Sequence, residues 1–158
     1  MPETAAKPRV ALGSDHAGFP IKETIRQFLQ NSGYAVEDLG TWSEESVDYP
    51  DYGQAVGESV ANRQNDFGIA VCGSGIGISI AANKVPHVRA ALAHDVNTAR
   101  LAREHNDANV LALGGRIVNG AQAIEMVQVF LSTPFAGGRH ARRVEKIELI
   151  EAEERRKS

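Results

Sequence analysis

Residues 66–82 place a thiol directly before a glycine-rich turn. Cys72 ends an apolar run, and the sequence Gly73-Ser74-Gly75-Ile76-Gly77 follows it at once. Glycines allow the backbone to turn sharply, and the first N–H groups of a helix have no acceptor within that helix. Such N–H groups can stabilise a developing negative charge, and a thiol beside them can act as a base or a nucleophile. The segment therefore indicates a site for proton transfer or covalent catalysis.

Other interpretations of the same segment are open at this point. Most single cysteines are buried and structural. The glycine spacing lacks the third glycine of the dinucleotide-binding fingerprint, and no Gly-Lys-Ser/Thr follows as it would in a Walker loop. Ser74 is a second candidate nucleophile, but no Gly-x-Ser-x-Gly elbow is centred on it. The pattern gives little support to nucleotide binding.

Three further polar segments could contribute to a site. Asp15 and His16 follow a short apolar run, where a helix cap with a solvated histidine is an equally good interpretation. The polar run 105–109 precedes another apolar run and is also typical of a turn. The basic segment 137–143 contains arginines, whose planar guanidinium groups match phosphate oxygens. The histidines are scattered and Cys72 stands alone, so we expect no metal site.

The elements that must position these residues alternate along the chain. Apolar runs predict five strands, the second of them at a sheet edge, at residues 9–13, 34–39, 67–72, 89–93 and 109–113. Helical periodicity and capping residues predict helices at residues 20–32, 51–63, 76–83, 96–104, 119–131 and 142–155, with a loop at 41–49. This alternation predicts an α/β protein with a three-layer Rossmann-like fold and a five-stranded parallel sheet.

Ligands of such sheets bind beyond the carboxyl ends of the strands. Asp15, Cys72 and the sequence Gly114-Gly115-Arg116 each follow a predicted strand, so we expect them at the same edge. His105 precedes the fifth strand and belongs to the opposite edge. A second subunit would have to supply His105 to the same pocket, which predicts a homodimer or a larger assembly.

The composition is that of a soluble protein and limits the possible partners. The 158 residues, 42% hydrophobic and 23% charged, predict one domain spanning 1–158, in which 137–155 forms a basic segment and the C-terminal helix. A net charge of −3 and the absence of a long apolar stretch argue against nucleic acid and membrane partners. A single cysteine fits a reducing cytoplasm. Residues 1–8 lack the features of a signal peptide and are predicted to be a disordered tail.

Taken together, the motifs show that the chain resembles ribose-5-phosphate isomerases of the B type, in the family that also includes galactose-6-phosphate isomerase subunits. The resemblance is carried by GSDHAGF at 13–19, DYPDY at 48–52, CGSGIGISIAANK at 72–84, HNDANVLALGGR at 105–116 and GGRHARRV at 137–144. It extends from about residue 10 to about residue 151. It implies aldose–ketose isomerisation of a pentose phosphate without a metal or an organic cofactor.

The resemblance also implies roles for the residues around the thiol. Cys72 matches the base that moves a proton between C1 and C2 of the sugar, and the segment 73–77 matches the turn that holds the enediolate. Ser74 stands where some members have threonine, and both residues carry a hydroxyl group. The members of the turn are Gly73, Ser74, Gly75, Ile76 and Gly77.

Other residues match positions that contact the substrate. The family's positions for sugar binding and ring opening correspond here to Asp15, Tyr49 and His105. A further substrate-contacting position corresponds to Asn106. The family's positions beside the substrate phosphate correspond here to His16, Arg139 and Arg143, and Arg116 joins them. In the family, His105 and Asn106 reach the site from a partner subunit, so the resemblance implies a homodimer or a homotetramer.

A consistent mechanism follows from these roles. A proton next to a carbonyl group can be removed only if the resulting oxyanion is stabilised, and each amide donor can contribute ~2.7–4 kcal/mol. The closed furanose must first be opened by an acid, and a bound phosphate positions the reacting carbons. We expect interconversion of D-ribose 5-phosphate and D-ribulose 5-phosphate through a cis-enediolate. An isomerase of allose 6-phosphate or galactose 6-phosphate and a non-catalytic sugar-phosphate-binding module remain alternatives.

Overall fold

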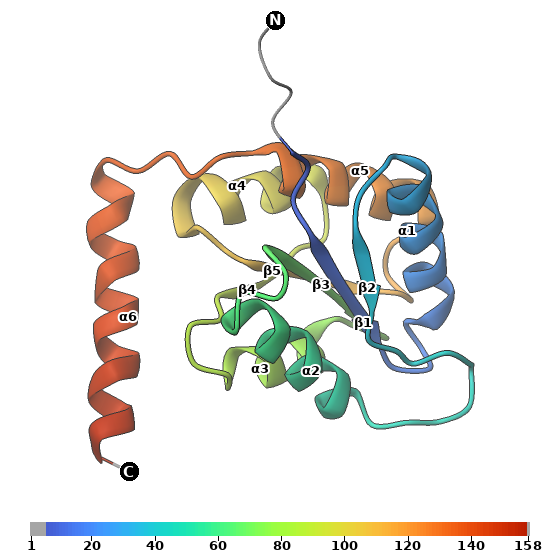
Figure 1. Ribbon diagram of the computed structural model, residues 1–158, viewed down its shortest axis with the longest axis horizontal. Coiled ribbons are helices and arrows are strands. Elements are labelled where there is room, and N and C mark those ends of the chain that lie inside the picture. The colour runs from blue at the N-terminus through green and yellow to red at the C-terminus, as the bar shows by residue number, and fades with distance from the viewer. Residues whose placement is uncertain (1–5, 158) are drawn as a thin grey trace, which may run out of the picture.

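The computed structural model describes residues 6–157, which form a sheet between two layers of helices with one more helix at the end of the molecule (Figure 1). In chain order the elements are β1 (Val10–Ser14), α1 (Phe19–Asn31), β2 (Val36–Asp38), α2 (Tyr49–Ala61), β3 (Phe67–Cys72), α3 (Ile76–Asn83), β4 (Ala90–Leu92), α4 (Val96–Asn106), β5 (Val110–Gly114), α5 (Gly120–Ser132) and α6 (Arg139–Lys157).

The five strands form one parallel sheet in the order β2-β1-β3-β5-β4. The central strand β3 pairs with β1 and β5, and its last residue Cys72 lies opposite Gly114 of β5. Ser14, the last residue of β1, lies opposite Val71. The carboxyl ends of the three central strands are therefore level, which confirms the predicted parallel sheet and the predicted edge position of β2.

Each face of the sheet is covered by its own helices. One hydrophobic cluster joins the sheet to α1, α4 and α5, and includes Ile69 and Val71 of β3. The other joins it to α2 and α3, and includes Ala70 and Cys72. Burial on both faces explains why the central strands are almost continuously apolar. Side-chain alternation along β3 directs Cys72 towards α2 and α3.

Two predicted helix caps are confirmed. The carboxylate of Asp95 accepts the N–H of Thr98 at 2.7 Å at the start of α4. The side-chain oxygen of Asn119 accepts the N–H of Gln122 at 2.9 Å at the start of α5. Both are capping boxes, which satisfy N–H groups that otherwise have no partner in the helix.

Two predicted helix starts were wrong by two or more residues. Helix α2 begins at Tyr49 rather than at residue 51, because Asp48 is extended (φ −96°, ψ 121°) and proline is well tolerated in the first turn of a helix. Tyr49 thus belongs to a helix and not to the predicted loop. Helix α6 begins at Arg139 rather than near residue 142, directly after Gly137 and Gly138, whose φ angles are +67° and +56°. Two left-handed glycines turn the chain straight into the helix.

Helix α6 stands at one end of the molecule, and the connecting segment 133–138 joins it to α5 (Figure 1). Val144 is buried, whereas Ile147, Leu149 and Ile150 are exposed. Among residues 6–157, no helix is both long and apolar enough to span a membrane. Of the predicted disordered tail, residues 1–5 lie outside the described part of the chain, and Lys7 lies over the ring of Tyr34 at 4.8 Å.

Candidate active site

Cys72 lies at the end of β3 with its sulfur held against the turn that follows. The N–H of Gly75 donates to its Sγ at 3.2 Å, and Cys72 is only 3% exposed. The N–H of Ile76 donates to the hydroxyl of Ser74 at 3.2 Å. Two N–H groups of the turn thus already have acceptors within it. The next N–H groups of α3, those of Gly77 and Ile78, are first-turn donors without an acceptor inside the helix.

The turn after Cys72 is packed so closely that side chains are excluded at two of its positions. Gly75 has a φ of +79°, and a Cβ there would lie 2.5 Å from Cδ1 of Leu92. A Cβ at Gly77 would lie 2.6 Å from ring atoms of Tyr49. Because position 75 needs a residue without a Cβ, glycine there lets the turn hold the N–H of Gly75 against the sulfur of Cys72. The close approach at Gly77 places the ring of Tyr49 directly on the N-terminal turn of α3.

Asp15 and His16 reach the same edge from the end of β1. The carboxylate of Asp15 accepts the N–H of Gly18 at 2.9 Å, and its own N–H donates to the carbonyl of Val71 at 3.2 Å. Nδ1 of His16 accepts the N–H of Val47 at 3.2 Å. In the neutral ring this hydrogen bond leaves the proton on Nε2, where it can be donated to a ligand.

Arg116 completes this group from the end of β5. Its N–H donates to the carbonyl of Gly73 at 3.0 Å, and the N–H of Gly115 donates to the carbonyl of Cys72 at 2.8 Å. The exposed guanidinium group lies against Gly73, because its Nη1 is 3.2 Å from the position that a Cβ of Gly73 would occupy. The structure thus brings together most of the predicted site residues at the carboxyl edge, which we call the carboxyl-edge group: Asp15, His16, Tyr49, Cys72, Gly73, Ser74, Gly75, Ile76, Gly77 and Arg116.

The remaining predicted residues lie at the opposite edge of the sheet. His105 and Asn106 are the last residues of α4, and α4 returns the chain to the amino ends of the strands. The ring of His105 stacks on that of His140 in the first turn of α6, with centroids 4.2 Å apart and an interplanar angle of 14°. Arg139 and Arg143 lie in the same first turns. We call these residues the amino-edge group: His105, Asn106, Arg139, His140 and Arg143.

The amino-edge group is positively charged, and one of its histidines is shifted towards the neutral form. The pKa of His140 is lowered, first by partial burial and then by the positive charge of His105, Arg139 and Arg143, while Glu104 opposes the shift. Such a group can bind an anion through its guanidinium groups and still hold a neutral imidazole. Within residues 6–157, no cluster of three or more His, Cys, Asp or Glu side chains is arranged to hold a metal ion.

Three features of the site have no counterpart in the sequence patterns. The N–H of Val47 orients His16 from a loop 31 residues away. His140, recognised only as part of a basic segment, pairs with His105. Arg89 and Arg103 hold the end of α4 through Asp107. Each depends on contacts between residues far apart in the sequence, so no local spacing of residues predicts it.

Comparisons with known proteins point to one family. Residues 10–147 match the Ribose/Galactose Isomerase family. The chain is 46% identical to ribose-5-phosphate isomerase B of Escherichia coli over 143 residues, which cover 90% of this chain and 96% of that protein.

Solved structures give the same result. A ribose-5-phosphate isomerase B of Clostridium thermocellum superimposes with a TM-score of 0.90 at 52% identity, covering 92% of this chain and 98% of that one. The enzyme of Mycoplasma genitalium with bound ribulose-5-phosphate superimposes with a TM-score of 0.87 at 42% identity, covering 92% and 97%. The parallel sheet, the Cys72 turn and nearly full-length similarity lead to one conclusion: the chain belongs to the ribose/galactose isomerase family.

Proposed function

We propose that this sugar-phosphate isomerase interconverts D-ribose 5-phosphate and D-ribulose 5-phosphate, with Cys72 as the base. The observation that carries the proposal is the contact between the sulfur of Cys72 and the N–H of Gly75 at the head of α3. Relatives named as ribose-5-phosphate isomerase B, one of them solved with bound ribulose-5-phosphate, support the choice of a pentose phosphate.

The proton transfer is assigned to the carboxyl-edge group. The thiolate of Cys72 takes the proton from C2 of the open-chain aldose. The electrons of that C–H bond form the C1–C2 double bond, and the π electrons of the C1 carbonyl move onto O1, which gives a cis-enediolate. The proton then returns to C1, while a hydroxyl proton moves from O2 to O1, so that the ketose forms with no net loss of protons. The N–H groups of Gly77 and Ile78 and the hydroxyl of Ser74 are the donors available to the oxyanion.

Ring opening and phosphate binding require the amino-edge group of a second chain. Opening a furanose requires a proton donor for the ring oxygen, and His105 fills this role beside Asp15 and Tyr49. His16 and Arg116 approach the phosphate from one chain. Arg139 and Arg143 approach it from the partner, together with His105 and Asn106, because these residues lie at the other edge of their own sheet. The active enzyme is therefore a homodimer or a homotetramer of such dimers.

Replacement of Cys72 tests the assignment of the base. Cys72→Ala should lower the exchange of solvent deuterium into ribulose 5-phosphate by about 10²–10⁴-fold, the usual contribution of general acid–base catalysis. Binding of the sugar phosphate, measured by calorimetry, should persist. Ser59→Ala, a substitution in α2 on the same face of the sheet, is the control. Turnover that survives in Cys72→Ala would exclude the thiol as the base.

The choice of sugar is tested by comparing kcat/KM values. Ribose 5-phosphate should have a larger kcat/KM than allose 6-phosphate or galactose 6-phosphate, assayed in parallel. A larger value for a hexose phosphate would change the substrate but keep the mechanism. If no sugar phosphate were turned over while binding was retained, the chain would be a binding module.

A further inference from the structure

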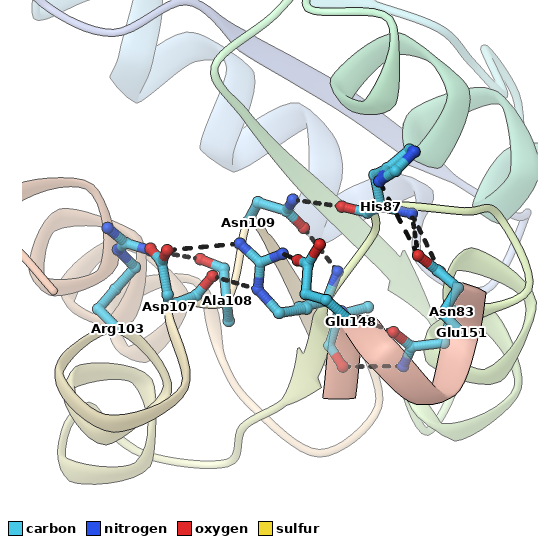
Figure 2. A network of polar contacts seen from close by, with 10 residues as sticks. Asn83, His87, Arg103, Asp107, Ala108, Asn109, Glu148 and Glu151 are labelled. Carbon is cyan, nitrogen blue, oxygen red and sulfur yellow. Dashed lines mark hydrogen bonds and ion pairs between the residues drawn. The ribbon is translucent and has the colours of Figure 1, made fainter. Parts of the chain in front are cut away.

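Arg89, in the connection before β4, contacts both of the helices that carry the amino-edge group. Its Nε donates to the carbonyl of Asp107 at 2.9 Å, and its Nη2 lies 3.5 Å from the Asp107 carboxylate. Its Nη1 donates to the carboxylate of Glu148 in α6 at 2.5 Å. The side chain of Arg89 is largely buried, with 19% exposed. One planar guanidinium group thus joins the end of α4 to the middle of α6. Its partners Asp107 and Glu148 are labelled in Figure 2.

On the α4 side the network fixes the residue that directly follows His105 and Asn106. Asp107 caps α4 in the left-handed region, at φ +47°. Its carboxylate accepts Nη1 of Arg103 at 2.8 Å, and the same Nη1 donates to the carbonyl of Ala108 at 2.7 Å. Arg103 is itself buried. Asp107 is therefore held between two arginines, and its position sets where α4 presents His105.

On the α6 side the network fixes the helix that carries Arg139 and Arg143. Besides the contact from Arg89 to Glu148, the carboxylate of Glu151 accepts the N–H of His87 at 3.0 Å. Figure 2 shows this second contact at the far end of the same network. Val144 is the buried apolar anchor of α6. With so little apolar packing, the angle of α6 depends on these polar contacts.

We propose that Arg89 is a positioning residue of the isomerase, which fixes the ring-opening His105 and the phosphate-binding Arg139 and Arg143 relative to one another. The proposal rests on the roles assigned to those residues above. Arg89 touches no reacting atom and acts through Asp107 on one side and Glu148 on the other. Lysine could not replace it, because a single ammonium group lacks the planar fork that reaches both partners.

The two arms of Arg89 predict different kinetic effects. Glu148→Gln weakens only the α6 arm and shifts the phosphate-binding arginines, so KM for ribose 5-phosphate should rise about fivefold while kcat changes less than twofold, the pattern of lost uniform binding. Asp107→Asn weakens the α4 arm and should lower kcat for ribose 5-phosphate. It should leave the rate of deuterium exchange into ribulose 5-phosphate unchanged, because that sugar is already open-chain and needs no ring opening. Arg89→Met should show both effects.

The experiment compares these variants with wild type and with Arg26→Met, a control that removes the paired arginine of α1, whose carboxylate partner is Glu23. Because Glu148 acts through Arg89, the Arg89→Met/Glu148→Gln double variant should have the same KM as Arg89→Met within about twofold. A KM for Arg89→Met within twofold of wild type, or an equal change in Arg26→Met, would overturn the proposal. If Arg89→Met does not fold, Glu148→Gln, at a half-buried position of α6, decides the same question.

A second measurement separates this inference from the proposed function. The stacked rings of His105 and His140 should show ring-current shifts in the histidine NMR resonances of the wild-type enzyme, and these should be lost in Arg89→Met. Loss supports positioning by Arg89, and unchanged resonances overturn it, whichever sugar phosphate is the substrate. A wild-type enzyme that turns over no sugar phosphate would defeat the proposed function, while the resonances would still test the position of His105.

Discussion

Cys72 is the most covered of the side chains that the proposed chemistry uses. Its sulfur faces the cluster formed with α2 and α3, and the N–H of Gly75 donates to it from the turn. Gly73, the next residue, has no side chain and is partly exposed, whereas Gly75 is buried against Leu92, so we expect a sugar carbon to approach the sulfur from the Gly73 side of the turn. A structural cysteine would need neither the N–H contact nor the glycines. The arrangement therefore favours a thiol that meets substrate through a narrow opening.

Alkylation of Cys72 measures this opening. We expect iodoacetamide to modify the native enzyme slowly, and ribose 5-phosphate to slow the reaction further by occupying the turn. Because the chain has a single cysteine, the modified mass reports this site alone. The alkylation rate of the chain unfolded in urea is the reference for a fully exposed thiol. A native protein that is never modified, or one modified equally fast with and without substrate, would contradict contact between the sulfur and the sugar.

The lowered pKa of His140 predicts a dependence of stability on pH. An unfolded histidine binds its proton near pH 6.5, whereas folded His140 binds it at a lower pH. The unfolded chain therefore holds more protons as the pH falls through this window, and the free energy of unfolding decreases. Urea unfolding at pH 7.5 and 5.5 should show a larger loss for wild type than for His140→Asn. Equal losses in the two proteins would contradict the shift.

Single residues could be predicted from the sequence where the chemistry is local. The thiol, the glycines and the polar residues after the strands are contiguous patterns, and the structure places Asp15, Cys72 and Arg116 at one edge as predicted. The stack of His105 on His140 joins residues 35 positions apart and has no periodic signal. The contacts of Arg89 depend on where α6 lies, which the sequence could not place.

At the scale of elements, the helices that cover the sheet are specified in the sequence by the residues of their first turns as much as by their apolar faces. The alternation of strands and helices and the caps of α4 and α5 follow from short patterns, so they were predictable. The start of α6 was not, because the spacing of Val144, Ile147 and Ile150 indicates its apolar side but not its first turn. The strand order was also unpredictable, since parallel strands are joined by crossovers that no local pattern specifies.

The cap of α5 can be removed without touching the site. Asn119→Ala should lower the free energy of unfolding by about 1 kcal/mol, because the N–H of Gln122 loses its acceptor. Asn119→Asp keeps an acceptor oxygen and should remain close to wild type. Urea unfolding measures both, and kcat/KM should be the same in all three proteins. An alanine variant as stable as the aspartate variant would show that the capping box contributes nothing here.

At the scale of the whole molecule, the two groups of site residues lie at opposite edges of one sheet, and each has exposed apolar neighbours. Ile76 of the carboxyl-edge group, and Ile80 and Ile117 beside it, are more than half exposed. Ile147 and Ile150 are exposed on α6, which begins at the amino-edge group. A twofold pairing would cover both surfaces and bring each carboxyl-edge group to the amino-edge group of the partner, giving two identical sites.

Mixing two inactive variants tests this pairing. Cys72→Ala damages the carboxyl-edge group and His105→Asn the amino-edge group, so each homodimer alone should lack ribose 5-phosphate turnover. In a mixed dimer one site combines intact Cys72 with intact His105, and the other site carries both substitutions. Random exchange makes half of the dimers mixed, so the mixture should recover about a quarter of wild-type activity. Light scattering should show dimers or tetramers throughout.

The matched control for this mixing experiment combines Cys72→Ala with Asp15→Asn. Both substitutions lie in the carboxyl-edge group, so every site of a mixed dimer carries one of them and no activity should return. Recovery in this control would mean that Asp15 and Cys72 serve different sites. An absence of recovery in the first mixture, despite proven subunit exchange, would mean that each chain builds its site alone. Because the topology keeps His105 away from Cys72 of its own chain, that result would remove His105 from the catalytic site.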